Sequence, residues 1–141
     1  MNGSVFLDTN ILVYLYSTSE AQKRNTSISI IKSYNCITST QALNEFSNVF
    51  IKKYKMQNDS IKTCITNISK PCLVQLVAES TISKALDLNS RYDYSYYDCL
   101  MLASALENNC EILFSEDMSG GQIIENKLKI INPYKECFTS T

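Results

Sequence analysis

Short apolar runs alternate along this chain with longer segments in which apolar residues recur every three or four positions. The short runs predict buried strands at residues 5–7, 36–38, 72–77, 111–114 and 128–131. The periodic segments predict helices at 11–16, 21–34, 40–54, 58–69, 78–92 and 96–108, with a further short helix at 122–126. Strands that alternate with helices in this way form parallel sheets covered by helices. We therefore expect an α/β protein with three layers, α/β/α, and a central parallel sheet of about five strands.

The size of the chain fits one domain. It has 141 residues, and 45% of them are apolar, which is enough for a hydrophobic core. Neither an internal repeat nor a low-complexity linker interrupts the pattern. We expect residues 1–135 to form this domain and residues 136–141 to form a polar C-terminal tail.

Charge and cysteine content restrict the setting in which the protein works. A net charge of −1 argues against a broad basic surface, so any contact with nucleic acid should be local. The six cysteines are widely spaced without a CxxC pair, which predicts buried thiols in a reducing compartment and no zinc site. The chain shows neither a signal-peptide pattern nor a long apolar run, so we expect a cytoplasmic protein without a membrane contact.

Acidic residues at the ends and edges of apolar elements are the strongest candidates for chemistry. They are Asp8, Glu45, Asp98 and Asp117. Carboxylates beside apolar surface are costly unless a positive charge compensates them, and the chain contains no histidine to share their work. A bound Mg²⁺ or Mn²⁺, which prefers oxygen ligands, would supply that charge. The pattern therefore favours metal-assisted phosphate chemistry.

Each of these acids also has an ordinary structural explanation. Asp8 can cap a helix, Glu45 can flank an apolar stripe, and Asp98 can be a first-turn acid that the helix dipole favours. Asp117 can be a turn residue. Their combination favours a site, because active sites of open parallel sheets lie beyond the carboxyl ends of the strands. Asp8 and the segment 115–117 both follow predicted strands and are expected to meet there.

Four segments of the sequence together resemble the PIN-domain family. They are residues 5–14 (VFLDTNILVY), 44–46 (NEF), 96–105 (YYDCLMLASA) and 113–118 (LFSEDM). The resemblance implies that the four acids form the metal site and that Asn10 and Ser115 support it. Small single-domain members are often VapC-type toxins of toxin-antitoxin pairs, which implies an RNA substrate, an antitoxin partner and a homodimer. Many toxin members carry an aromatic residue shortly after the last acid, whereas residues 118–122 here read MSGGQ.

The mechanism that these residues suggest is hydrolysis of RNA by a metal-activated water. Asp8, Asp98 and Asp117 would surround one or two Mg²⁺ ions, with Glu45 binding metal or orienting the water. By resemblance to the family, the products would carry a 5′-phosphate and a 3′-hydroxyl. A metal-free mechanism through the 2′-hydroxyl commonly uses histidine as acid and base, and histidine is absent.

Candidate substrate contacts lie outside the acidic motifs. Lys52 and Lys53 would bind RNA phosphates, although they also suit the solvated C-terminus of a helix. Tyr94 would stack on an unpaired base, although aromatic residues at the start of a buried helix also serve as core.

Other functions remain open from the sequence. One is a PIN nuclease that is not a toxin and acts in RNA processing or on structured DNA. Another is a metal-binding or RNA-binding module without catalysis, because a motif alone does not establish turnover.

Overall fold

A mostly parallel sheet forms the centre of the computed structural model, which describes residues 3–118 and 120–135. The strand order is β3-β2-β1-β4-β6-β5. The strands are β1 (Ser4–Leu7), β2 (Asn35–Ser39), β3 (Cys72–Gln75), β4 (Ile112–Phe114), β5 (Ile123–Ile124) and β6 (Leu128–Ile131). The five strands expected from the sequence are β1, β2, β3, β4 and β6, and all their mutual pairings are parallel. The predicted parallel sheet is confirmed.

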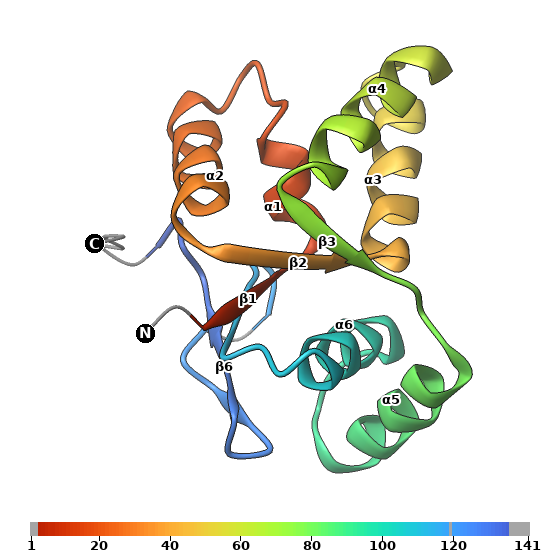
Figure 1. The fold of residues 1–141 in the computed structure, drawn as a ribbon, viewed down its shortest axis with the longest axis vertical. Helices are drawn as coiled ribbons and strands as arrows, with labels where there is room; N and C mark the ends of the chain where they lie inside the picture. The colour runs from red at the N-terminus through yellow and green to blue at the C-terminus, as the bar shows by residue number, and fades with distance from the viewer. Residues whose placement is uncertain (1–2, 119, 136–141) are drawn as a thin grey trace.

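Helices cover both faces of this sheet, as Figure 1 shows. On one face lie α1 (Thr9–Tyr14), α2 (Ala21–Ser33), α3 (Thr40–Lys52) and α4 (Asn58–Ser69). On the other face lie α5 (Glu79–Arg91) and α6 (Tyr96–Glu107). The α/β/α layering expected from the alternating pattern is therefore confirmed. Within the described residues, none of the helices combines the length and the apolar character needed to cross a membrane.

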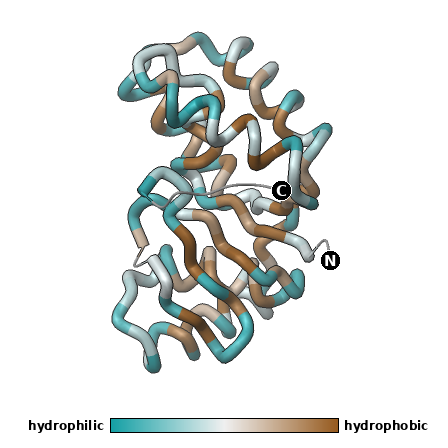
Figure 2. The backbone as a smooth tube through the Cα atoms, turned by 90° about the vertical axis from the view of Figure 1, so that its left-hand side faces the viewer, coloured by the Kyte–Doolittle hydropathy of each residue, from teal (hydrophilic) through white to brown (hydrophobic). Residues whose placement is uncertain are grey.

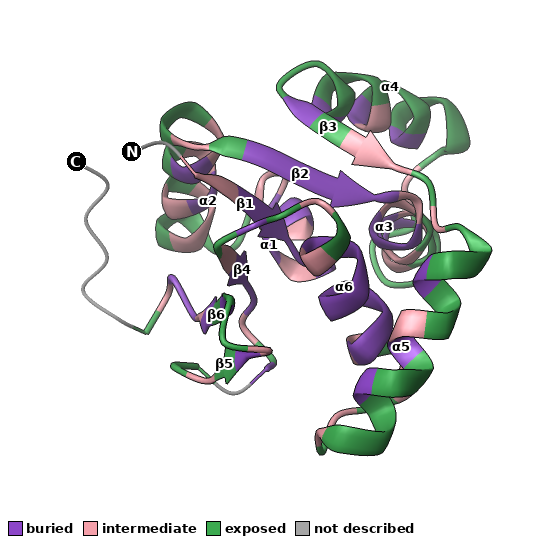
Figure 3. Cartoon of the chain, turned by 60° about the horizontal axis from the view of Figure 1, so that its bottom comes forward, coloured by how far each residue is buried: buried purple, intermediate pink, exposed green. Residues whose placement is uncertain are grey.

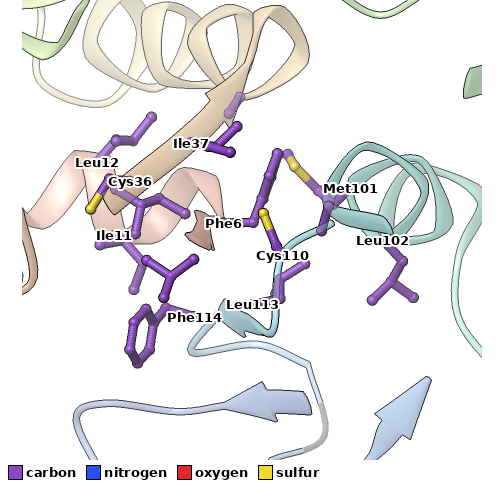
Figure 4. Packing of buried hydrophobic residues seen from close by; sticks show 14 of the residues in the cluster. Phe6, Ile11, Leu12, Cys36, Ile37, Met101, Leu102, Cys110, Leu113 and Phe114 are labelled. Carbon is purple, nitrogen blue, oxygen red and sulfur yellow. The ribbon is translucent and has the colours of Figure 1, made fainter. Parts of the chain in front are cut away.

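The core lies on both faces of the central strands. Figure 2 shows the hydrophobic residues concentrated along the strands in the middle of the molecule. In Figure 4, Phe6 of β1 lies toward Met101 of α6, whereas Phe114 of β4 lies near Ile11 of α1. These four side chains are at most 1% exposed. Alternate strand positions thus fill the two interfaces between the sheet and its helices.

Helix α6 is buried on almost every side, which explains its continuous apolar sequence. Residues 99–105 are all buried, because the helix lies between the sheet and α5 (Figure 3). A helix that is apolar all round is expected only where it is enclosed. Asp98, the acidic residue of its first turn, is half-buried and lies directly before this enclosed stretch.

The predicted short helix at 122–126 is wrong. The segment contains β5 (Ile123–Ile124), which pairs antiparallel with β6 through a tight turn. Glu125 and Asn126 have φ angles of 54° and 57° in this turn, a conformation that a right-handed helix excludes. The Tyr92 hydroxyl contacts both the backbone N–H and the carboxylate of Glu125, each at 3.0 Å. These distant contacts hold the turn and are not visible in the local sequence.

The predicted C-terminal tail, residues 136–141, lies outside the described residues.

Candidate active site

All the acids predicted from the sequence line one pocket of about 390 Å³, namely Asp8, Glu45, Asp98 and Asp117. The pocket lies at the carboxyl ends of β1 and β4. The paired ends of these strands are Leu7 and Phe114, and the Asp8 N–H donates to the Phe114 carbonyl at 3.1 Å. This pairing brings Asp8 and the loop after β4 side by side although more than a hundred residues separate them.

Asp8 is the most enclosed of these acids, with 7% of its surface exposed. Its Oδ1 accepts the Thr9 N–H at 2.7 Å, and its Oδ2 accepts the Ser115 hydroxyl at 2.7 Å. Burial, assisted by the negative charges of Asp98 and Glu45, raises the pKa of Asp8 to about 6 in spite of both hydrogen bonds. Asp8 does cap α1, but its charge remains uncompensated by any of its hydrogen-bond partners.

Glu45 projects from α3 and is held at both carboxylate oxygens. The Thr9 hydroxyl donates to its Oε1 at 2.7 Å, and the Gln41 side-chain amide donates to its Oε2 at 2.9 Å. Gln41 also donates to the Tyr97 carbonyl at 3.1 Å, which ties α3 to the start of α6 beside Asp98. Thr9 and Gln41 were not predicted as site residues, although Gln41 lies one helical turn before Glu45, a spacing visible in the sequence.

Asp98 occupies the first turn of α6, where its N–H donates to the Ser95 hydroxyl oxygen at 3.2 Å. Burial raises the pKa of Asp98, and the charges of Asp117 and Glu45 act in the same direction. The helix-dipole explanation therefore holds for its position, yet the side chain faces further negative charge. A carboxylate in such surroundings is suited to a cation.

Asp117 is exposed in the loop after β4 and is held by the two residues predicted to support the site. The Asn10 side-chain amide donates to Asp117 Oδ2 at 3.2 Å. The Asp117 N–H donates to the Ser115 hydroxyl oxygen, also at 3.2 Å. Asn10 and Ser115 thus connect this loop to α1 and to Asp8, whereas their functional role stays a prediction.

Glu116 anchors the same loop and was not predicted from the sequence. The Tyr14 hydroxyl donates to its Oε1 at 2.6 Å, and the Lys23 ammonium contacts its Oε2 at 2.5 Å. Although burial alone would raise it, the pKa of Glu116 is lowered overall by the hydrogen bonds from Lys23 and Tyr14. Glu116 lines the pocket, but Lys23 already neutralises its charge.

The donors of this pocket suit Mg²⁺ or Mn²⁺. The acids supply oxygen ligands, and among the described residues that line the pocket only Lys53 has a cationic side chain. In the described part of the chain, no group of three or more acidic or cysteine side chains lies close enough together to hold an ion. Like charges repel until a cation neutralises them, so binding would draw these carboxylates inward. The residues fit a divalent cation in chemical type and in number.

Of the three residues predicted to bind substrate, one lines the acidic pocket and two do not. Lys53 lines the acidic pocket, whereas Lys52 is exposed and is not part of its lining. Tyr94 lies outside the pocket, where its hydroxyl contacts the Gln122 side chain. The tyrosines that line the pocket are Tyr14 and Tyr54. The pocket geometry therefore gives no support to stacking by Tyr94.

Comparison with known proteins places this arrangement in a family. The profile of the PIN domain family matches residues 5–119. A search of curated proteins gives no significant match. Solved structures that share the fold include VapC20 of Mycobacterium tuberculosis, a toxin that cleaves the sarcin-ricin loop. That structure has a TM-score of 0.64 and 18% identity, and the match covers 80% of this chain and 91% of VapC20.

Two complexes show the same fold. A toxin-antitoxin complex from Klebsiella pneumoniae matches with a TM-score of 0.71 and 19% identity, covering 94% of this chain and 99% of that one. VapBC2 from Rickettsia felis, bound to a DNA fragment from its promoter, matches with a TM-score of 0.66 and 15% identity, covering 92% and 99%. At these identities the structures establish a common fold. Because the family profile spans most of the chain, this protein belongs to the PIN-domain family, a family of nucleases.

Proposed function

We propose that this protein is a Mg²⁺- or Mn²⁺-dependent endoribonuclease that acts as the toxin of a toxin-antitoxin pair. The observation that carries the proposal is the convergence of Asp8, Glu45, Asp98 and Asp117 on one pocket, in which Lys53 is the one lysine among the described lining residues. The structural relatives support the choice of substrate and partner, since one is a toxin that cleaves the sarcin-ricin loop and another is a toxin-antitoxin complex.

The acids divide into ligands and an orienting group. Asp8, Asp98 and Asp117 are the proposed ligands, and Glu45 either joins them or orients the attacking water. When bound, a divalent cation lowers the pKa of a coordinated water and offsets negative charge on the reacting phosphate. Thr9 and Gln41 hold both oxygens of Glu45, so that its remaining lone pairs face the pocket in a fixed direction.

The bond changes follow from attack by water. The water oxygen bonds to phosphorus and loses a proton to the surrounding carboxylates, while the bond from phosphorus to the 3′-oxygen breaks. The 3′-oxygen takes up a proton, so the products carry a 5′-phosphate and a 3′-hydroxyl. Lys53, which lines the same pocket, would bind a phosphate oxygen of the same strand.

The proposal is tested by incubating end-labelled single-stranded and hairpin RNAs with the protein in Mg²⁺, Mn²⁺ or EDTA. We expect cleavage with either metal, no cleavage in EDTA, and 5′-phosphate ends. Cleavage in EDTA that leaves 2′,3′-cyclic phosphate ends would contradict the metal mechanism. Absence of cleavage under every condition would favour a binding module. The toxin role is tested separately by expression in bacteria, where the wild type should arrest growth and Asp98→Asn should not.

Replacing Ser115 by Ala should lower metal-dependent cleavage by about 10- to 100-fold at limiting Mg²⁺, the usual effect of losing a group that orients a metal ligand. The Ser115 hydroxyl donates to Asp8 and accepts the N–H groups of Asp117 and Met118. Its loss should raise the Mg²⁺ concentration that gives half-maximal rate. Ser69→Ala, at an exposed serine of α4 whose hydroxyl donates to the Ile65 carbonyl of the same helix, should leave that concentration unchanged. Equal curves for the two variants would refute the positioning role.

A further inference from the structure

A column of aromatic rings ends at the acidic pocket. Phe46 and Phe50 of α3 are buried, with ring centroids 4.7 Å apart, and Tyr54 packs on Phe50 at 5.0 Å with an interplanar angle of 32°. Tyr16 closes the other end of the column against Phe46 at 6.0 Å. The ring of Tyr54 is therefore supported from the protein side, yet 45% of the residue remains exposed.

Lys53 lies over this exposed ring. Its ammonium group is 5.4 Å from the centroid of the Tyr54 ring, and both residues line the same pocket as the acids. Neither of the ion pairs found among the described residues involves Lys53. The wall of the pocket at the end of α3 therefore presents a supported aromatic face and a cation that is not paired with a carboxylate.

The other tyrosine in the pocket lining is committed to structure. The Tyr14 hydroxyl contacts Glu116 at 2.6 Å, and its ring packs edge-on against Tyr134 with centroids 5.0 Å apart. Tyr14 is also only partly exposed, whereas Tyr54 is exposed. Tyr54 is consequently the pocket tyrosine whose ring is the more exposed to a ligand, and Lys53 is the side chain that lies over it.

We propose that Tyr54 and Lys53 form a nucleotide subsite for single-stranded RNA, in which Tyr54 stacks on an unpaired base and Lys53 binds a neighbouring phosphate. This inference rests on the proposed nuclease function and adds the residues that bind the substrate strand beside the reacting phosphate. Each part of a nucleotide at the pocket would then have a binding group. The acids act on the reacting phosphate, Lys53 binds the next phosphate, and Tyr54 stacks on the base. Bases inside a duplex are covered by their neighbours, so the subsite selects unpaired RNA.

The test measures RNA binding in an Asp98→Asn background, where the RNA stays intact. The probes are a fluorescein-labelled single-stranded RNA of mixed sequence, about ten nucleotides long, and its blunt duplex, followed by fluorescence anisotropy. Tyr54→Ala should weaken single-strand binding about tenfold and leave duplex binding unchanged. Tyr54→Phe keeps the ring and should restore the affinity.

The lysine is tested by the salt dependence of binding. Lys53→Met should reduce the slope of log affinity against log salt concentration by about 0.7, the value for one phosphate contact on a single strand. Lys127→Met removes the same charge from an exposed residue that lines a separate pocket with Glu111, at the amino end of β4. It should leave the slope unchanged. Tyr54→Ala should weaken binding without changing the slope.

Three results would overturn the subsite. They are unaltered single-strand affinity in Tyr54→Ala, an equal loss for single strand and duplex, and no measurable binding of single-stranded RNA by the parent protein. Cleavage by the wild type in Mg²⁺ is measured in parallel. If the wild type cleaves RNA and Tyr54→Ala binds it normally, the subsite is rejected and the nuclease proposal stands. If the wild type does not cleave RNA but Tyr54→Ala binds it more weakly, the nuclease proposal is rejected and the RNA contact of Tyr54 stands.

Discussion

Replacing Asp98 by Asn is expected to reduce Mg²⁺-dependent RNA cleavage by about a thousandfold. The amide keeps the size of the side chain and the N–H contact to Ser95 that begins α6. It removes one negative charge from the pocket shared with Asp8, Glu45 and Asp117. A metal ligand contributes several kcal/mol to stabilisation of the transition state, and each 1.36 kcal/mol corresponds to about a tenfold change in rate.

The matched control for this variant is Asp93→Asn. Asp93 is an exposed acid close to Asp98 in the sequence, but it is not part of the pocket lining. Its cleavage rate should stay within about twofold of the wild type, as expected of a surface change away from the site. Because the surroundings of Asp98 raise its pKa, the Asn variant should also be at least as stable as the wild type in EDTA. Equal loss of activity in both variants, or full activity in Asp98→Asn, would reject Asp98 as a ligand.

The metal-free protein is expected to lose on the order of 3 kcal/mol of unfolding free energy between about pH 4 and pH 7.5 through Asp8 alone. The pKa of Asp8 rises from an ordinary value of 3.8 to about 6 in the folded protein. The folded state therefore binds this proton more tightly than the unfolded chain does. The resulting stabilisation is complete below the unfolded pKa and is lost as the pH rises through 6.

Other acids change this profile in known directions. The raised pKa of Asp98 adds an effect of the same sign. The lowered pKa of Glu116 acts oppositely, because its stabilisation is present at higher pH and is lost as the pH falls below the range where an unfolded glutamate titrates. Unfolding in urea with EDTA is therefore compared at pH 5 and pH 7.5, both above the pKa of an unfolded glutamate; about half of the Asp8 effect, on the order of 1.5 kcal/mol, falls in this window.

The control for the pH effect is Asp8→Asn. Any hydrogen bond that the Asn side chain fails to make is missing at every pH, and the side chain does not titrate. The unfolding free energy of this variant should therefore fall less than that of the wild type between pH 5 and pH 7.5. Addition of Mg²⁺ at pH 7.5 should stabilise the wild type and have little effect on Asp8→Asn. Parallel profiles for the two proteins would show that Asp8 titrates normally.

The convergence of the acids could be predicted from the sequence because it follows from topology. Asp8 follows the first apolar run and residues 115–117 follow another, and parallel neighbouring strands bring such ends to one edge. Asp98 could be recognised because it is an acid within a helix that is otherwise apolar on all sides. The meeting of Asp8 with residues 115–117 thus required only the order and type of the elements, whereas the grouping of all four acids was implied by the resemblance to the PIN-domain family.

The contacts that hold the acids could not be predicted in the same way. The Glu116 carboxylate meets Lys23 across 93 residues, and no periodicity links these positions. The turn at Glu125 and Asn126 depends on Tyr92 from the end of α5, so local propensity favoured a helix wrongly.

The choice between tyrosines also needed the structure. Tyr94 stands close to Asp98 in the sequence, but its hydroxyl contacts Gln122 away from the pocket. Tyr54 follows the C-terminus of α3, where its ring packs on Phe50 at 5.0 Å and lines the pocket.

The central claim is that the carboxylate pocket binds a divalent cation, and Mn²⁺ titration followed by calorimetry tests it most directly. The wild type should show saturable binding of one or two ions, and the double variant Asp8→Asn/Asp98→Asn should show none at the same concentrations. Saturable binding that is equal in both proteins, or no binding by the wild type up to about 10 mM Mn²⁺, a concentration far above that of a working metal site, would contradict it.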